Sequence, residues 1–222
     1  MKKFFILAAL ALLPFFAKAQ NLCPDSHHPH MIDLGLPSGT KWACCNVGAS
    51  TPDGYGSFFA WGETKTKSTF NWSTYRWCNG SETTLTKYNN SSDYGTVDNK
   101  TQLDFSDDAA RANWHGSWCM PTIAELEELK ANCSYIWTTI NGVKGGKFTS
   151  RSNGSSIFLP AAGWHNATSL NCRGEYGSYW SSSLKESLPN GARCLDFDLN
   201  GVYANSHYYR FHGHSVRPVL RN

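Results

Sequence analysis

Asn-Gly pairs between short β-prone runs are the feature that most constrains the fold of this chain. Asn141-Gly142 and Asn153-Gly154 separate three such runs, 136–140, 146–150 and 156–159. Asn and Gly readily adopt the positive φ angles that tight hairpin turns require. We therefore predict antiparallel hairpins, and with them an antiparallel sheet, in the C-terminal third of the chain.

Composition supports a predominantly β fold with few helices. The 222 residues include 9 Trp, 10 Tyr and 12 Phe, which favour strands, and 19 Gly, which favours turns. The formal net charge is +3, only 17% of the residues are charged, and Lys and Arg do not cluster. Nucleic-acid-binding proteins usually carry a basic patch, so no nucleic-acid partner is predicted.

The N-terminus has the pattern of a cleaved secretory signal. Lys2-Lys3 precedes an apolar run over 4–16, and Ala17-Lys18-Ala19 has the small-x-small pattern of a cleavage site. The apolar run is shorter than the about 20 residues of a membrane-spanning helix, so no membrane span is predicted. We expect residues 1–19 to be a signal peptide. Residues 20–222 should form a single domain that is secreted or periplasmic, with attachment to the cell surface as an alternative.

Two segments carry helix start signals. Thr122 and Glu125 form a capping box ahead of apolar residues at helical spacing, which predicts a helix from Thr122 to about Asn132. Ser106-Asp107-Asp108 places capping and acidic residues before a short helix over 109–114. The side chains expected to be buried on the longer helix are Ile123, Leu126 and Leu129. The predicted fold class is therefore α+β, with antiparallel sheets and two helices.

The stretch 64–100 is polar, rich in Ser, Thr, Asn and Gly, and without hydrophobic periodicity. Such a composition is typical of a loop. Structureless loops of this length are uncommon inside a compact domain. We expect the aromatic residues spaced through the stretch to pin it to the core in short, irregular pieces.

The densest polar-aromatic stretch of the chain runs over 202–214. Tyr, His, Asn, Ser and Arg provide broad aromatic faces and hydrogen-bonding groups on stems with few rotatable bonds, as in antibody loops. We interpret the stretch as a ligand-recognition surface and expect Tyr203, Tyr208, Tyr209 and Arg210 to be largely exposed. The alternative is a pair of strands whose aromatic side chains cover a sheet face. The candidate ligand-binding residues are Lys185, Glu186, Asn190, Arg193, Tyr203, Asn205, His207, Tyr208, Tyr209, Arg210 and His212.

No metal or cofactor is predicted. Residues 196–201 match the first half of a calcium loop, but His207 stands where such a loop needs a bidentate Glu. We interpret the segment as a strand with Leu195, Phe197 and Leu199 facing inward and both Asp side chains outward, followed by a turn. Eight cysteines in the exported part permit disulfides, but the sequence leaves their pairing open.

Seven motifs are spread over residues 33–218. They are Asp33-Leu34-Gly35-Leu36-Pro37-Ser38-Gly39-Thr40-Lys41-Trp42-Ala43, Phe59-Ala60-Trp61-Gly62-Glu63, Asp107-Asp108-Ala109-Ala110, Ser117-Trp118-Cys119-Met120-Pro121-Thr122, Phe158-Leu159-Pro160-Ala161-Ala162-Gly163, Tyr179-Trp180-Ser181-Ser182-Ser183 and Ser215-Val216-Arg217-Pro218. In this order they resemble the Fibrobacter succinogenes major paralogous domain family, which is abundant in exported proteins of Bacteroidetes. The resemblance implies a C-type-lectin-like fold, in which a helix pair packs on antiparallel sheets and the chain termini lie near each other. Activity in that family is largely uncharacterised, so the resemblance implies an architecture more than a function.

The Trp-x-x-Pro-Thr-x-x-Glu pattern at 118–125 is also similar to that of the formylglycine-generating enzymes, which share the broad fold. Those enzymes oxidise a substrate cysteine with copper held by two cysteines near the C-terminus. Here Pro218 stands where the enzyme-like ending would carry a thiol, and Cys172 and Cys194 are the only late candidates. A disulfide or buried thiols are the preferred interpretation of these two cysteines.

We conclude from the sequence that the chain is an exported, C-type-lectin-like domain that binds a protein or glycan ligand through the candidate residues. Some proteins with this fold are diversified by retroelements, which turn Asn codons into Tyr, His, Ser or Asp codons. Tyr203, Asn205, His207 and Tyr208 belong to that set, and diversification of the stretch is an open hypothesis. The alternatives are an enzyme related to the formylglycine-generating group and a structural component of a surface assembly.

Overall fold

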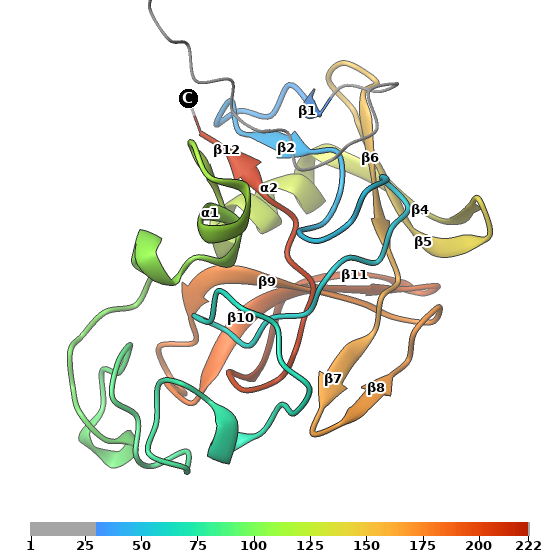
Figure 1. The fold of residues 1–222 in the computed structure, drawn as a ribbon. Coiled ribbons are helices and arrows are strands. Elements are labelled where there is room, and N and C mark those ends of the chain that lie inside the picture. The colour runs from blue at the N-terminus through green and yellow to red at the C-terminus, as the bar shows by residue number, and fades with distance from the viewer. Residues whose placement is uncertain (1–29, 222) are drawn as a thin grey trace, which may run out of the picture.

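The computed structural model describes residues 30–221. The predicted signal peptide, 1–19, its cleavage site and Cys23 lie outside the described residues. Within 30–221 the chain forms antiparallel sheets and two α-helices (Figure 1). The structure thus confirms the α+β class with antiparallel sheets and two helices.

The strands of the described chain form four sheets. The first has the order β1 (Met31–Asp33), β2 (Lys41–Ala43), β12 (Val219–Leu220) and β3 (Trp118–Cys119). The central sheet has the order β11 (Gly201–Tyr209), β10 (Gly191–Asp198) and β9 (Gly177–Leu184). The third has the order β4 (Cys133–Ile140), β5 (Val143–Ser150) and β6 (Ser156–Pro160), and the fourth pairs β7 (Trp164–Asn166) with β8 (Ser169–Asn171). Because β1 and β12 belong to one sheet, the two ends of the described chain are neighbours (Figure 1).

The predicted hairpin turns are confirmed. Asn141 and Gly142 alone join β4 to β5, with φ angles of 49° and 84°. A two-residue turn of this kind needs positive φ at both positions, which is why Asn-Gly is favoured there. A longer loop over 151–155 joins β5 to β6, and Gly154 within it has a φ of 75°.

Both predicted helices form, as α1 (Ala109–Trp114) and α2 (Ile123–Asn132). α1 begins after Asp108, whose carboxylate accepts a hydrogen bond from the backbone N–H of Arg111 at 3.0 Å. This contact satisfies one of the donors that a helix start leaves without an intrahelical partner. No helix between residues 30 and 221 is long and apolar enough to cross a membrane.

The capping box at the start of α2 closes as predicted. The Glu125 N–H donates to the Thr122 hydroxyl at 3.2 Å, and the Thr122 N–H donates to the Glu125 carboxylate at 2.7 Å. Leu126 and Leu129 are buried, as expected. Ile123, at the first position of the helix, is only half-buried.

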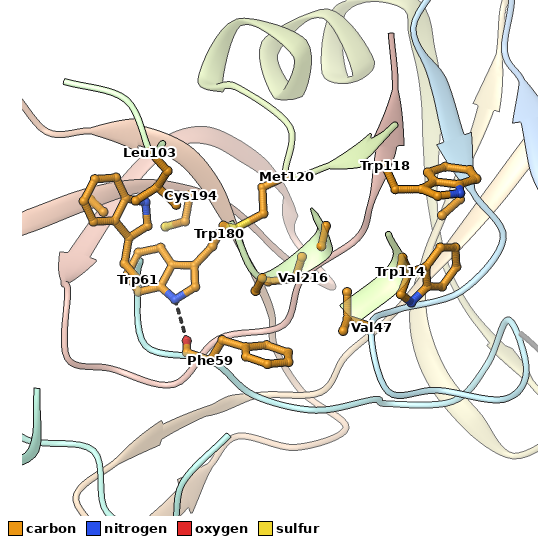
Figure 2. Packing of buried hydrophobic residues seen from close by; sticks show 14 of the residues in the cluster. Val47, Phe59, Trp61, Leu103, Trp114, Trp118, Met120, Trp180, Cys194 and Val216 are labelled. Carbon is orange, nitrogen blue, oxygen red and sulfur yellow. Dashed lines mark hydrogen bonds between the residues drawn. The ribbon is translucent and has the colours of Figure 1, made fainter. Parts of the chain in front are cut away.

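Two buried clusters make up most of the core. The tryptophan cluster, part of which is drawn in Figure 2, includes Trp61, Trp114, Trp118, Trp180 and Val216. The α2 cluster includes Leu126, Leu129, Phe148, Tyr179 and Val219. Within the tryptophan cluster, the Trp180 indole N–H donates to the Phe59 backbone oxygen at 2.8 Å (Figure 2).

The central sheet separates these two clusters. Successive side chains of a strand point to opposite faces of its sheet. On β10, Ala192 and Cys194 belong to the tryptophan cluster, whereas Leu195 and Phe197 belong to the α2 cluster. This sheet is therefore buried on both faces over much of its length.

The long stretch 64–100 is held to the core by aromatic side chains, as predicted. Tyr75 and Tyr88 are buried, and the Tyr75 hydroxyl donates to the backbone oxygen of Trp61 at 2.8 Å. The stretch contains two short 3-10 helices, Trp72–Thr74 and Ser92–Tyr94, and a third, Phe105–Asp107, follows it. The stretch is therefore irregular and well anchored.

Candidate ligand-binding site

Residues 202–209 of the predicted recognition stretch lie on β11, an outer strand of the central sheet, and residues 210–214 follow it. Tyr203 and Tyr209 are 48% and 46% exposed, which confirms the expectation for these two side chains. The expectation that Tyr208 is largely exposed is wrong, because its ring packs against the tryptophan cluster and is half-buried. Ala204 is buried. Within β11 the stretch thus alternates between more exposed and more buried side chains, whereas residues 210–214 are all buried.

A β-bulge divides β11 into two ends. The pairing of β10 with β11 shifts by one residue between Cys194 and Asp196, so that Ala204 and Asn205 together oppose Leu195. An extra residue of this kind interrupts the regular alternation of side chains along a strand. Residues at every second position of β11 therefore do not all point to the same face of the sheet.

Tyr203 and Tyr209 consequently lie on opposite faces of the sheet. Tyr203 pairs with Asp196, and Tyr208 pairs with Ala192. Asp196 and Ala192 are an even number of positions apart on β10 and share a face. Tyr203 thus shares a face with Tyr208, and Tyr209 lies on the other.

The C-terminal end of β11 forms one side of a pocket of about 320 Å³, which we call the β11 pocket. Its lining residues are Leu188, Asn190, Gly191, His207, Tyr208, Tyr209 and His212. All of them except Leu188 and Gly191 are among the residues predicted from the sequence. The structure therefore brings together five predicted residues from two separate segments.

Gly191 keeps the pocket open. It lies opposite Tyr209 in the β10–β11 pairing. A Cβ atom at position 191 would stand 3.3 Å from the Tyr208 backbone oxygen and 3.5 Å from the His207 ring. The sequence offers no signal for this role, because it depends on which residue lies across the sheet.

Aromatic contacts hold the pocket walls in place. The Tyr209 ring stacks on Phe211 with centroids 5.7 Å apart and meets the edge of Trp72 at 5.8 Å. The Tyr208 ring lies 6.0 Å from that of Trp164. Rings packed in this way keep their orientation before a ligand arrives, which lowers the entropic cost of binding.

The two histidines of the pocket are neutral at neutral pH. Burial lowers the pKa of His212 to about 4. The pKa of His207 is also lowered, first by burial and then by the positive charges of Lys185 and Arg193. The buried Nδ1 of His212 has no hydrogen-bond partner among the described residues.

Asn190 is buried where the β9–β10 turn meets β11. Its side-chain nitrogen donates to the Glu82 carboxylate at 3.0 Å. Its backbone oxygen accepts a hydrogen bond from the Arg210 N–H at 3.0 Å. Because the amide nitrogen is engaged, the amide oxygen is the group left to accept a hydrogen bond from a ligand.

The expectation that Arg210 is largely exposed is wrong. Its side chain is 0% exposed, and its guanidinium lies over the rings of Trp61 and Tyr75. Nη1 donates to the backbone oxygens of Lys87 and Tyr88 at 3.1 and 2.8 Å. A planar cation stacks well on aromatic faces while its N–H groups reach carbonyls, so Arg210 ties the stretch 64–100 to the end of β11.

The remaining predicted residues lie outside the pocket lining. Lys185 and Glu186 follow β9 in the turn toward β10, where Glu186 is exposed and Lys185 half-buried. Arg193 is half-buried on β10. Tyr203 and Asn205 are exposed at the other end of β11 and at the bulge.

Two expectations about the segment 195–199 are wrong. Asp196, expected to face outward, is buried, and its carboxylate accepts a hydrogen bond from the Ser178 hydroxyl at 2.7 Å. Leu199, expected to face inward, is 71% exposed. The reason is that β10 ends at Asp198, which leaves Leu199 in the turn and outside the alternation of the strand.

Ser178, Asp196 and His214 form a buried polar network that the sequence did not indicate. The Ser178 hydroxyl lies between the Asp196 carboxylate and Nδ1 of His214. Burial raises the pKa of Asp196 and lowers that of His214 well below its usual value. In a hydrolytic triad the histidine stands between the other two groups and the serine is accessible. Here the serine is central and fully buried, so the network joins β9, β10 and the C-terminal segment.

The two cysteines considered for copper lie in different environments. Cys194 is fully buried on β10, where burial raises its pKa, and Cys172 is exposed after β8. Both are free thiols. Between residues 30 and 221, no group of three or more His, Cys, Asp and Glu side chains is placed to hold a metal ion.

These features define an α+β domain with a preformed, aromatic-walled pocket at the edge of its central sheet. Comparison with protein families matches residues 81–219 to a family described as Domain of unknown function (DUF8237). The match spans more than half of the chain, and the chain belongs to this family. The matched range contains the whole central sheet and all residues that line the β11 pocket. No curated protein and no solved structure matches the chain.

Proposed function

We propose that the chain is an exported recognition domain that binds a protein or glycan ligand at the β11 pocket. The observation that carries the proposal is the meeting of Asn190, His207, Tyr208, Tyr209 and His212 around one hollow. Preformed concave sites with mostly aromatic walls and a few polar groups are typical of ligand-binding sites. Tyr and His also give large contact areas with few rotatable bonds.

The proposal includes a C-type-lectin-like fold. Two features support it within the described residues: the combination of two helices with antiparallel sheets, and the first sheet, where β1 and β12 place the chain ends together. The seven motifs that resemble the major paralogous domain family add support from sequence. An experimental structure with a different strand order would contradict this part of the proposal.

Export is proposed from the N-terminal pattern. The basic start, the apolar run and Ala17-Lys18-Ala19 together support cleavage by a signal peptidase. Mass spectrometry of the protein recovered outside the cytoplasm should show an N-terminus at or beside Gln20. A cytoplasmic protein that retains Met1 would overturn export.

The binding test uses Tyr209 and Tyr203 as a matched pair. Both are tyrosines of β11 with nearly equal exposure, and only Tyr209 lines the pocket. The mature domain is screened against a printed glycan array and a displayed peptide library. For any ligand found, Tyr209→Ala should weaken binding by about 30-fold, equivalent to about 2 kcal/mol, as expected for a central aromatic contact. Tyr203→Ala should change binding by less than about twofold.

The same pair makes the proposal falsifiable. Equal losses in the two variants would place the binding surface outside the pocket. Unchanged binding in Tyr209→Ala, or no binding on either library, would contradict a recognition site at the β11 pocket. Thermal unfolding of both variants serves as the control for folding.

A further inference from the structure

We propose that the β11 pocket binds an uncharged sugar ring of a glycan. This inference rests on the proposed recognition function and names the chemical class of its ligand. Three properties of the pocket carry it: the absence of charge in its lining, its rigid aromatic walls, and its neutral hydrogen-bonding groups.

The lining of the pocket contains no ammonium, guanidinium or carboxylate group. His212 is neutral at neutral pH because burial lowers its pKa to about 4. The neighbouring Lys185 and Arg193 help to keep His207 neutral as well, because they lower its pKa. A charged group entering this pocket would lose water without meeting an opposite charge in the lining, which is costly, and the positive charges of Lys185 and Arg193 outside the lining disfavour a cation further. Charged ligands are therefore disfavoured.

The aromatic walls suit the apolar face of a sugar ring. Tyr209 is fixed by Phe211 and Trp72, and Tyr208 by Trp164. A pyranose ring presents C–H groups on its faces, which pack on aromatic surfaces and remove apolar area from water. The pocket volume of about 320 Å³ lies near the lower end of the range of ligand pockets. One or two rings at the end of a glycan therefore fit better than a long chain.

The neutral polar groups favour a sugar over an aromatic side chain of a protein. His212 has a buried Nδ1 without a hydrogen-bond partner within residues 30–221, and leaving such an atom unsatisfied is unfavourable. The amide of Asn190 is oriented by Glu82, which leaves its oxygen as an acceptor. Sugar hydroxyls both donate and accept, so one hydroxyl can donate to the Asn190 oxygen, and a neighbouring hydroxyl can serve His212 once a small shift of its ring exposes Nδ1 to the pocket. A tyrosine or tryptophan of a protein ligand carries a single polar group on its ring.

The test uses the wild-type mature domain on a printed glycan array, with free methyl glycosides as competitors. Methyl glucoside, galactoside, mannoside and N-acetylglucosaminide are compared with glucuronic and N-acetylneuraminic acids. We expect at least one neutral glycoside to compete with a dissociation constant of about 1 mM or below, the range for a ligand of this size. The acids should compete at least about tenfold more weakly, because the lining of the pocket has no cation to pair with their carboxylates. Binding should persist in a metal chelator.

A variant tests the hydrogen bond at the pocket wall. His212→Phe retains an aromatic ring and removes Nδ1, and it should weaken the neutral glycoside by about tenfold, the loss expected for one hydrogen bond. Titration of the glycoside into ¹⁵N-labelled wild type should shift the amide signals of residues 188–191 and 207–212. The competition and the titration use the wild type alone, so the test stands if His212→Phe does not fold.

The outcomes separate this inference from the proposed function. Competition by neutral glycosides, with shifts confined to the pocket segments, supports both. Binding of peptides only, weakened by Tyr209→Ala and not competed by glycosides, overturns the sugar inference and leaves the recognition function standing. Preference for the acidic sugars also overturns the sugar inference. Binding that is insensitive to Tyr209→Ala overturns both.

Discussion

The two ends of β11 carry the same kinds of side chain in different surroundings. Tyr203, near the start of the strand, pairs across the sheet with Asp196, which is buried and hydrogen-bonded. Tyr209, at the end of the strand, pairs with Gly191, which has no side chain. The two tyrosines are almost equally exposed, yet only the second borders the β11 pocket. A recognition site on a strand thus depends on what lies opposite each residue as much as on its own chemistry.

The faces of the sheet sharpen this contrast. At the Tyr203 end, Ala204 packs into the α2 cluster, and at the Tyr209 end Tyr208 packs against the tryptophan cluster. The bulge opposite Leu195 lets one strand serve both clusters, because it exchanges the two faces halfway along. Each end of β11 therefore exposes the face that the other end buries.

The largest loss in the free energy of unfolding should come from truncating the buried side chain that follows Tyr209. Arg210→Ala removes a fully buried side chain and leaves the backbone oxygens of Lys87 and Tyr88 without this donor. We expect the free energy of unfolding to fall by about 3–5 kcal/mol, the range for truncating a large buried side chain. Urea denaturation measures the loss. Arg193 is half-buried on β10, so Arg193→Ala is the control and should lose less than about 1 kcal/mol. A loss in Arg210→Ala as small as that of the control would show that Arg210 is not part of the core.

A somewhat smaller loss is expected beneath the Tyr203 end. Leu126 of α2 belongs to the cluster that also buries Ala204. Leu126→Ala should lower the free energy of unfolding by about 2–5 kcal/mol through lost burial and a cavity. Ile136→Ala on β4, where the side chain is 60% exposed, should stay within about 0.5 kcal/mol. A loss below about 1 kcal/mol for Leu126→Ala would remove this residue from the cluster.

Giving the Tyr209 end an opposing side chain should make it resemble the Tyr203 end. In Gly191→Val, the added atoms enter the pocket between Tyr208 and His207, and Gly191 lies in a strand where Val is favourable. Ligand binding should fall by at least about tenfold, or about 1.4 kcal/mol. The free energy of unfolding should change by less than about 1 kcal/mol. Unchanged affinity in this variant would show that the ligand does not enter the pocket.

The smallest expected change is a loss in the free energy of unfolding as the pH falls and His212, at the wall of the pocket, becomes protonated in the unfolded chain. The pKa of His212 is about 4 in the folded protein and near 6.5 in the unfolded chain, so the unfolded chain takes up its proton first as the pH falls. Stability due to this group is complete above about pH 6.5 and declines toward the folded-state pKa. Between about pH 7.5 and about pH 6 the loss should be roughly 0.8 kcal/mol for such a histidine.

In His212→Phe the free energy of unfolding should therefore fall less between the two pH values than in the wild type, as measured by urea denaturation. His207→Phe is the matched control, because His207 is exposed at the same pocket and should contribute less. The pKa of His214 is lowered more strongly by burial, and this histidine should contribute to the acid sensitivity that remains. An unchanged slope in His212→Phe would show that this imidazole is accessible to protons in the folded state.

Local signals predicted the secondary structure well. The capping box at Thr122 and the Asn141-Gly142 turn act within a few residues, so their physical basis is complete in the sequence. The anchoring of 64–100 was also predictable, because a long polar stretch with spaced aromatics has few other ways to join a compact domain. The grouping of the strands into four sheets was not predicted, since pairing joins residues far apart in the chain.

The sequence by itself determined the class of the fold, the two helices, the hairpin turns and the stretch of chain that lines the pocket. Only the tertiary structure decided which side chains of that stretch reach the surface. Arg210 is buried over distant aromatic rings, with Nη1 donating to a distant backbone oxygen, and Asp196 is buried beside the Ser178 hydroxyl. Gly191 opens the pocket because pairing places it opposite Tyr209. Caps and turns depend on neighbours in sequence, whereas burial and concavity depend on neighbours in space, and a single bulge in β11 is enough to change which neighbours those are.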